Sequence, residues 1–273
     1  MIYLYAHTNH KSGLDSLRRV AALYWQFEKE GVECELLFND YRAQLAAKSW
    51  GLPLATTIET IKDIDAVADI NDVIVIDSPE PIEGKVLGYP EYFKKVIYLD
   101  SSFGKQEFNG AKVIDIFHKN SSVFREVEQN VSKKALFIYG DSDYEKTILK
   151  NLENFKDKEL NLYWGNYFFI KYEDEMMQHF GEMVETEDYY EALSEYEYIV
   201  TSSLQIAIEA AGNGVKTLFL DLLETSNSTK EILHKFDIPI KNTTQALELS
   251  TITENEKIKN SSEKIINIIK NYV

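Results

Sequence analysis

The stretch Ile199–Asp221, IVTSSLQIAIEAAGNGVKTLFLD, constrains the fold more than any other part of this chain. It begins as a strand end and continues through three hydroxyl residues, a short apolar helix, a two-glycine stop and a buried strand, Thr217–Asp221. Each hydroxyl side chain can cap the start of the helix. A helix that begins at the carboxyl end of a parallel strand is where α/β folds bind phosphorylated ligands. The stretch therefore predicts an α/β protein with such a site at Ser202 and Ser203.

Glu209 is the only charged residue inside this expected helix, where its neighbours are small or apolar. A charged side chain in that position is either a solvated part of the helix surface or a residue that binds a ligand. The helix taken alone does not decide between the two readings.

Composition narrows the class of protein. The chain has 273 residues and a formal net charge of −16, so nucleic acids and anionic membranes are poor partners for it as a whole. A nucleotide can still bind locally, through helix N-termini and backbone N–H groups. The lone cysteine, Cys34, excludes a disulfide framework. We find no signal segment and no apolar run of about 20 residues, and so expect a cytoplasmic protein without a transmembrane segment.

Apolar runs and amphipathic segments alternate along the chain, which is typical of an α/β protein. In the first half the expected strands are Ile2–Ala6, Val32–Phe38, Val73–Asp77, Val96–Asp100 and Val113–Phe117. The expected helices there are Leu14–Glu30, Asp40–Trp50 and Thr56–Ala68.

A second series of elements begins with the strand Ala135–Tyr139 and a glycine-containing loop. Further on we expect helical stretches at Met176–Met183 and Tyr189–Tyr196, a loop at Thr225–Thr229 and a terminal helix within Asn242–Asn271. Both series open with a strand, a loop and a helix. The sequence therefore predicts two Rossmann-like domains, residues 1–131 and 132–273, that face a central cleft.

The candidate ligand residues follow predicted strands, because the carboxyl ends of parallel strands form the ligand side of an open sheet. In the first domain they are His7, His10, Gly13, Asp15 and Asp77. In the second they are Gly140, Asp141, Ser142, Ser202, Ser203, Glu209 and Asn227. An acid at a strand end can be a general base, a metal ligand or a helix cap, and caps are the commonest. No metal-site spacing accompanies the two histidines, so we expect neither a metal nor another cofactor.

The region 163–198 is unusually dense in aromatic and acidic residues. Such a surface can stack against a sugar or meet a protein partner. The competing interpretation, which we favour, is the packing of amphipathic helices whose acidic face is solvated.

Three features together resemble the GT-B superfamily: Ser12–Asp15 before a helix, the loop Gly140–Asp143 after a mid-chain strand, and Ser202–Ser203 separated by five residues from Glu209. The chain looks most similar to the branch that holds the UDP-sugar hydrolase of pseudaminic acid synthesis, SpsG-type proteins and the N-acetylglucosaminyltransferase of lipid II synthesis. The resemblance implies an enzyme of bacterial surface or flagellar glycan synthesis, which hydrolyses a UDP-sugar or transfers its sugar. It also implies that the Ser202–Ser203 turn and the Gly140–Ser142 loop hold the pyrophosphate and that Glu209 holds the ribose. We expect Gly13, Asp77 and Asn227 near the substrate.

The chain departs from this family where its catalytic histidine is expected, because Asp15 stands in that place. One glycine is also missing from the loop at Gly140. Three alternatives remain: Asp15 is the base, since a carboxylate can activate a hydroxyl; His10 or His7 has taken over that role; or catalysis is lost and the protein is a binding or scaffold relative.

Overall fold

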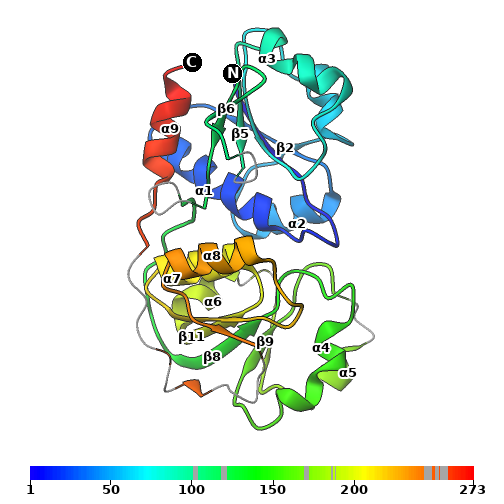
Figure 1. The fold of residues 1–273 in the computed structure, drawn as a ribbon, viewed down its shortest axis with the longest axis vertical. Coiled ribbons are helices and arrows are strands. Elements are labelled where there is room, and N and C mark those ends of the chain that lie inside the picture. The colour runs from blue at the N-terminus through cyan, green and yellow to red at the C-terminus, as the bar shows by residue number, and fades with distance from the viewer. Residues whose placement is uncertain are drawn as a thin grey trace. The chain divides into compact units, whose positions relative to one another are not determined.

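This computed structural model describes residues 1–100, 104–117, 122–168, 172–185, 187, 189–242, 248–249, 252 and 258–273. Its contacts divide the chain into two compact units (Figure 1). Unit 1 comprises Met1–Asn9, Leu14–Arg125 and Asn260–Val273. Unit 2 comprises His10–Gly13 and Glu126–Lys259.

The described part of unit 1 is built on a seven-stranded sheet in the order β3-β2-β1-β4-β5-β7-β6. Its strands are β1 (Ile2–Ala6), β2 (Glu35–Phe38), β3 (Thr56–Thr57), β4 (Val73–Asp77), β5 (Lys95–Leu99), β6 (Glu107–Phe108) and β7 (Ala111–Ile114). All neighbouring strands are parallel except β6 and β7. The carboxyl ends of β1 and β4 therefore lie side by side at one edge of the sheet.

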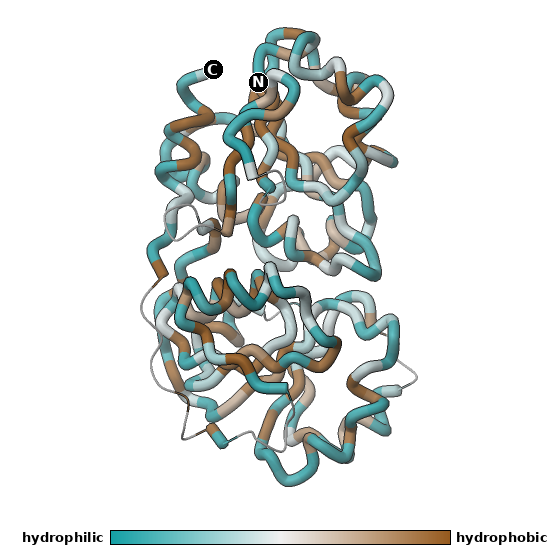
Figure 2. The backbone as a smooth tube through the Cα atoms, viewed as in Figure 1, coloured by the Kyte–Doolittle hydropathy of each residue, from teal (hydrophilic) through white to brown (hydrophobic). Residues whose placement is uncertain are grey.

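Side chains on successive strand residues point to opposite faces of this sheet. Tyr3 and Tyr5 of β1 pack in a buried cluster with residues of the 3₁₀ helices η1 (Ile61–Ala66) and η2 (Gly84–Gly88) and of α3 (Tyr89–Tyr92). The long helix α1 (Asp15–Lys29) packs against β1 and β4, and α2 (Tyr41–Ser49) packs against α1 and β2. Along the helices in Figure 2 apolar and polar residues alternate, as expected when one face packs and the other meets solvent.

The C-terminal helix α9 (Ser262–Lys270) belongs to unit 1, where it packs on α1 (Figure 1). Lys270 forms an ion pair with Glu30 at the end of α1, with 2.7 Å between Nζ and Oε2. Upstream of α9, the Asn260 side chain donates a hydrogen bond to the carbonyl of Phe124 at 2.9 Å. The sequence-based division put residues 260–273 in the second domain. In the structure they belong to unit 1, because they contact α1 and Phe124, and the order of elements along the chain does not reveal such contacts. Of the predicted Asn242–Asn271 helix, residues 243–247, 250–251 and 253–257 lie outside the described residues.

Unit 2 contains a parallel sheet, six-stranded over the described residues, in the order β10-β9-β8-β11-β12-β13. Its strands are β8 (Lys133–Ile138), β9 (Asn161–Tyr163), β10 (Met183–Val184), β11 (Tyr196–Thr201), β12 (Lys216–Leu220) and β13 (Ile240–Lys241). Its helical elements are α4 (Thr147–Lys150), η3 (Leu152–Asn154), α5 (Glu173–Met176), α6 (Tyr189–Glu195), α7 (Leu204–Gly212) and α8 (Asn227–Lys235). The predicted α/β class with two parallel sheets is confirmed.

Three local predictions are wrong. The expected helix at Thr56–Ala68 is the strand β3 followed by η1, because Thr60 and Asp63 form a capping box that starts the helical turn at Ile61. The expected helix Met176–Met183 begins at the residue where α5 ends, and Met183 pairs with Leu162 of β9 instead. The expected loop Thr225–Thr229 contains the start of α8, where Ser226 caps the helix by accepting from the N–H of Thr229.

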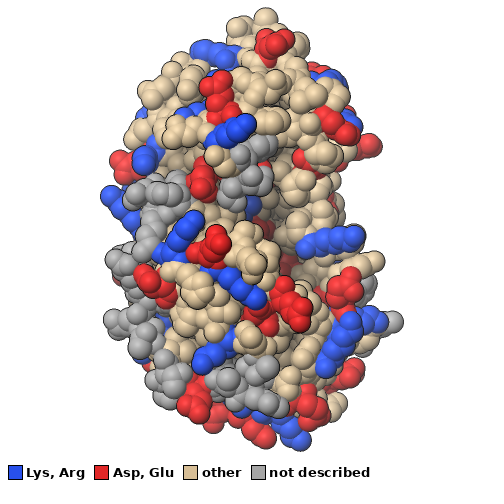
Figure 3. Space-filling model, in the orientation of Figure 1, with Lys and Arg blue, Asp and Glu red and all other residues tan. Residues whose placement is uncertain are grey.

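No helix in the part of the chain that the structure describes is long and apolar enough to cross a membrane. Positive and negative side chains are interspersed over the face drawn in Figure 3, despite the net charge of −16.

Candidate functional site

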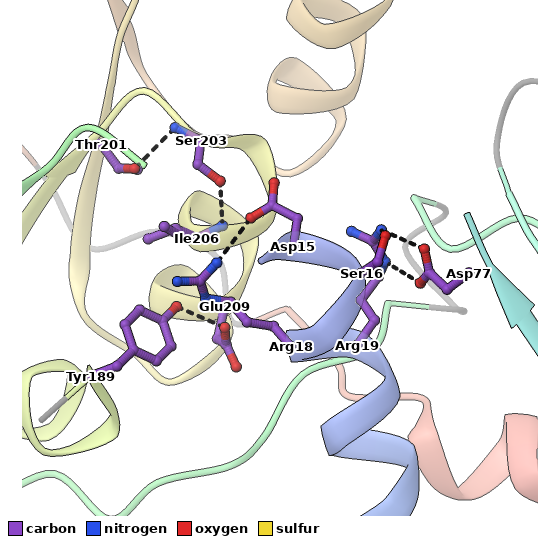
Figure 4. Close-up of polar contacts among 10 residues, drawn as sticks. All are labelled: Asp15, Ser16, Arg18, Arg19, Asp77, Tyr189, Thr201, Ser203, Ile206 and Glu209. Carbon is purple, nitrogen blue, oxygen red and sulfur yellow. Dashed lines mark hydrogen bonds and ion pairs between the residues drawn. The ribbon is translucent and has the colours of Figure 1, made fainter. Parts of the chain in front are cut away.

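The turn between β11 and α7 uses its three hydroxyl residues for different tasks, and Figure 4 shows two of them, Thr201 and Ser203. The Thr201 hydroxyl accepts from the N–H of Ser203 at 3.1 Å, and the Ser203 hydroxyl caps α7 by accepting from the N–H of Ile206 at 3.2 Å. The Ser202 hydroxyl donates to the carbonyl of Leu220 at 2.6 Å, which ties the turn to the end of β12. The predicted phosphate turn is thus a well-formed helix start at the carboxyl end of a parallel strand.

Glu209 lies inside unit 2 with no solvent exposure. Its carboxylate accepts a hydrogen bond of 2.8 Å from the hydroxyl of Tyr189, a fully buried residue at the start of α6 (Figure 4). The reading of Glu209 as a solvated helix position is therefore wrong. A role as a ligand residue stays a prediction. Sequence reasoning did not single out Tyr189, because its spacing from Glu209 carries no periodic signal.

The loop Gly140–Asp143 follows β8 and comes shortly before the helix α4. The Asp143 carboxylate accepts from the N–H groups of Thr147 and Ile148, the latter at 2.9 Å. Burial raises the pKa of Asp143, and these backbone bonds act in the opposite direction. The hydroxyl of Ser142 is buried and has no hydrogen-bond partner among the described residues. An orphan polar atom of this kind fits a site that a ligand completes.

Two glycines fix where Asp141 of this loop lies. A Cβ on Gly165 would lie 2.4 Å from the Asp141 carbonyl oxygen, and the neighbouring Tyr167 N–H donates to that oxygen at 2.8 Å. A Cβ on Gly13, where φ is +64°, would lie 2.8 Å from Asp141 Oδ2. Only glycine fits such close approaches without a shift of the loop.

The structure therefore brings together three residues that were predicted separately, since His10, Gly13 and Asp141 all belong to unit 2. The His10 ring lies 4.7 Å from the ring of Tyr144, centroid to centroid. Tyr144 is half-exposed, and no sequence signal marked it.

The other predicted residues of unit 1, Asp15 and Asp77, are held by arginines of α1 (Figure 4). Asp15 pairs with Arg18 at 3.2 Å. Both oxygens of Asp77 accept from Arg19, at 2.6 Å from Nε and 2.7 Å from Nη2. Although burial opposes its charge, Asp77 raises the pKa of Arg19. The Asp77 carboxylate thus fixes α1 on the end of β4.

A group of side chains that the sequence did not predict surrounds Glu80, just after β4. Its carboxylate accepts from the hydroxyl of Tyr5 at 2.6 Å, the hydroxyl of Ser78 at 2.9 Å and the N–H of Ile61 at 3.1 Å. His7 lies at the carboxyl end of β1, and burial lowers its pKa while the charges of Glu80 and Asp40 oppose that shift. Sequence reasoning included His7 but could not connect it with Glu80, which is far away along the chain.

The remaining predictions involve Asn227 and the region 163–198. Asn227 is the first residue of α8. Most of the described aromatic side chains of 163–198 pack inside unit 2, including Tyr163, Tyr189 and Tyr196, so packing accounts for their density. A protein partner at this region stays a prediction. Over the described residues, no three His, Cys, Asp or Glu side chains form a group that could hold a metal ion.

A groove of about 450 Å³ lies at the opposite, amino edge of the unit 1 sheet. Its lining is Met1, Tyr24, Glu28, Gly31, Val32, Glu33, Cys34 and Glu35. None of the predicted site residues borders it, and parallel sheets bind ligands at their carboxyl edge, so we do not assign the site there.

No protein-family model matches this chain, and no curated protein matches it. Solved structures do match along its whole length. MnaA of S. aureus, in a co-structure with UDP, shares 12% identity, with 99% of this chain and 96% of that chain covered and a TM-score of 0.62. The UDP-GlcNAc 2-epimerase of Methanocaldococcus jannaschii, in complex with UDP-GlcNAc and UDP, shares 10% identity, with coverage of 99% and 100% and a TM-score of 0.58.

The chain has the GT-B fold. The spinosyn forosaminyltransferase SpnP extends the similarity to a transferase, at 10% identity, 99% and 94% coverage and a TM-score of 0.50. At such identities the likeness shows the fold alone, and fold does not fix function. The predicted two-domain GT-B architecture is confirmed at this level.

Proposed function

We propose that this protein binds a UDP-sugar and acts on it in bacterial glycan synthesis, as a hydrolase or a glycosyltransferase. The start of α7 and the loop Gly140–Ser142, both in unit 2, support the proposal. At α7, Ser203 is engaged in capping, and the backbone N–H groups of the first turn point toward the carboxyl edge. The loop Gly140–Ser142 carries the Ser142 hydroxyl, which has no partner among the described residues. A helix N-terminus suits a phosphate of a nucleoside diphosphate without a metal.

The observation that carries the proposal is the buried carboxylate of Glu209, six residues after the cap of α7. A buried carboxylate has a fixed position and accepts strong, charge-assisted hydrogen bonds. The two neighbouring hydroxyls of a ribose are suitable donors to it. The similar structures of MnaA and of the Methanocaldococcus jannaschii epimerase hold UDP, the latter together with UDP-GlcNAc, which favours uridine among the nucleotides.

The experiment is a thermal-shift titration of the full chain with UDP, with ADP and GDP as controls. Saturation at about 100 times the dissociation constant should stabilise the fold by about 2.7 kcal/mol. Glu209→Gln, which keeps the side-chain volume and an oxygen for Tyr189, should abolish most of the shift. Glu191→Ala, at an exposed position of α6, should leave it unchanged. Absence of a shift with every nucleotide at millimolar concentration would falsify the proposal.

The finer assignment, a relative of the UDP-sugar hydrolase of pseudaminic acid synthesis, rests on the resemblance of the sequence motifs. In this assignment Asp15 or His10 is the base, as predicted from the sequence. Release of UDP from a panel of UDP-sugars in water tests hydrolysis, and release that needs an added sugar acceptor tests transfer. Loss of activity in Asp15→Asn or in His10→Gln identifies which of the two residues is required.

A non-catalytic binding protein is the competing proposal, and the ion pair between Asp15 and Arg18 favours it. A carboxylate held by an arginine is a weaker base than a free one. This alternative expects UDP binding without turnover of any UDP-sugar. Turnover that is lost in Asp15→Asn would exclude it.

A further inference from the structure

The groove of about 450 Å³ at the amino edge of the unit 1 sheet has no role in the proposed function. Ligand sites in proteins typically have volumes of about 300–1,000 Å³, so the groove can hold a small molecule. Its walls come from Met1, which precedes β1, and from the stretch Tyr24–Glu35, which runs from α1 to the start of β2. All of these residues belong to unit 1.

The main chain at the end of α1 has a fixed course beside the groove. Gly31, where φ is +67°, donates its N–H to the carbonyl of Glu28 at 3.0 Å. The N–H of Val32 donates to the carbonyl of Phe27 at 3.0 Å, and the Phe27 side chain is fully buried. Bonds of this kind close the end of a helix and set the direction of the chain that follows. The groove is therefore preformed.

Four of the side chains that line the groove are apolar or aromatic, namely Met1, Tyr24, Val32 and Cys34. None of the four is fully buried, so a ligand that covers them removes apolar surface from water. Burial raises the pKa of the Cys34 thiol to about 12, and the charge of Glu28 adds to this rise. The thiol is therefore uncharged at neutral pH, and these walls fit an apolar body.

The charged side chains that line the groove are all acidic: Glu28, Glu33 and Glu35. The three are exposed, and none takes part in an ion pair among the described residues. The ammonium group of Met1 is already paired with Asp72 at 2.8 Å. The negative charges of the three carboxylates therefore act together on the groove and attract a cation.

A metal ion is not the cation that this arrangement fits. A metal site needs several ligand atoms that converge on one point. No three His, Cys, Asp or Glu side chains in the described ranges form such a group. Carboxylates that are spread around an apolar groove fit a larger cation, in which the charge is carried by an organic group. The ring of Tyr24 fits the same ligand, because aromatic faces attract organic cations.

We propose that this groove is a binding site for a small organic cation with an apolar body, of the class of aromatic and aliphatic ammonium compounds. Glu28 and Glu33 attract the charge, and Tyr24 and Val32 contact the body. The site shares no residue with the proposed UDP-sugar site, so neither proposal depends on the other.

Cys34 allows a direct test, because it lines the groove and is the single cysteine of the chain. Two methanethiosulfonate reagents of opposite charge, trimethylammonioethyl and sulfonatoethyl, are compared by mass spectrometry on the full chain, and each rate is divided by the rate with 2-mercaptoethanol. At low ionic strength the cationic reagent should be preferred at Cys34 by at least about tenfold. Cys34→Ser should take up neither reagent. A smaller preference, or a preference for the anionic reagent, would overturn the proposal.

Binding is measured by calorimetry with benzyltrimethylammonium, in which a permanent positive charge is joined to an apolar ring. Phenylacetate, which is anionic, and tetramethylammonium, which lacks the ring, should each bind at least about tenfold more weakly. Bound benzyltrimethylammonium should also slow the modification of Cys34 by the uncharged reagent methyl methanethiosulfonate. Protection of Cys34 by a lysine-rich peptide but not by benzyltrimethylammonium would overturn the proposal in favour of a protein partner.

Glu28→Gln and Tyr24→Leu should each weaken the binding of benzyltrimethylammonium by at least about threefold. The matched control is Glu59→Gln, an exposed position just after β3 at the other edge of the sheet, which should leave binding unchanged. Melting temperatures show whether the variants fold. Unchanged binding in a folded Glu28→Gln or Tyr24→Leu variant would contradict the proposal. UDP binding, measured separately, tests only the proposed function.

Discussion

The hydroxyl of Tyr189 and the carboxylate of Glu209 form a buried hydrogen bond of 2.8 Å that joins α6 to α7 inside unit 2. The residue proposed to bind ribose thus already has a partner within the protein. The Glu209 carboxylate contributes both to the proposed ligand binding and to stability, and substitution of Tyr189 separates these two contributions.

Tyr189→Phe should lower the free energy of unfolding by about 1–3 kcal/mol, because it removes a donor from a buried carboxylate. UDP affinity should be kept in this variant, since the Glu209 carboxylate itself is unchanged. Urea unfolding and calorimetric titration with UDP measure the two effects. A variant that is as stable as wild type but no longer binds UDP would contradict this account.

Asp77→Asn should destabilise the protein by about 3–5 kcal/mol, because it removes the charge of the carboxylate that holds the buried Arg19 through two hydrogen bonds. The matched control is Asp65→Asn, whose ion pair with Lys85 is exposed and whose loss should cost less than about 1 kcal/mol. Urea unfolding compares the two. If Asp77 instead serves the substrate, as the sequence analysis expected, Asp77→Asn will lose activity with little loss of stability.

Gly165→Ala should destabilise unit 2 by about 1–3 kcal/mol and weaken UDP binding, because its Cβ would collide with the backbone of Asp141. Gly88→Ala is a suitable control, since a Cβ there meets nothing within 4 Å. Thermal unfolding with and without UDP checks both expectations. Equal stability of the two variants would show that the Gly140–Asp143 loop can shift at little cost.

Stability should fall through His7 as the pH drops from about 6.5 toward the folded pKa. Burial lowers its pKa in the folded protein below the value of about 6.5 expected for the unfolded chain. In this range the unfolded chain binds the proton more readily, so the contribution of His7 is complete above about pH 6.5 and is lost as the pH falls toward the folded pKa. His7→Gln should flatten the pH dependence measured by urea unfolding, and His234→Gln should not. A steeper dependence in His7→Gln would show that the folded pKa is raised.

Strongly periodic or continuously apolar segments could be predicted from the sequence. The strands Ile2–Ala6 and Val73–Asp77 match β1 and β4 residue for residue, because buried parallel strands are apolar throughout. The segment Thr56–Ala68 could not be predicted in this way, since its start depends on the side-chain bonds between Thr60 and Asp63. The position of α9 on α1 depends on tertiary contacts that no local pattern contains.

The candidate site shows the same division between local and distant information. The cap of α7 is a local motif, and Ser203 performs that task in the structure. The partners of the predicted acids were not predictable, because Arg19 and Asp77, or Tyr189 and Glu209, meet only in the folded chain. Glu80 was missed for the same reason, since its partners come from β1 and from the start of η1.

The return of Asn260–Val273 to unit 1 has a consequence for the order of events during synthesis. The ribosome makes Glu126–Lys259 before α9, which takes on the order of ten seconds at roughly 5–20 residues per second. Throughout that time α9 does not yet cover the face of α1 on which it packs. Unit 1 therefore starts the chain but completes its fold last, after most of unit 2 has emerged.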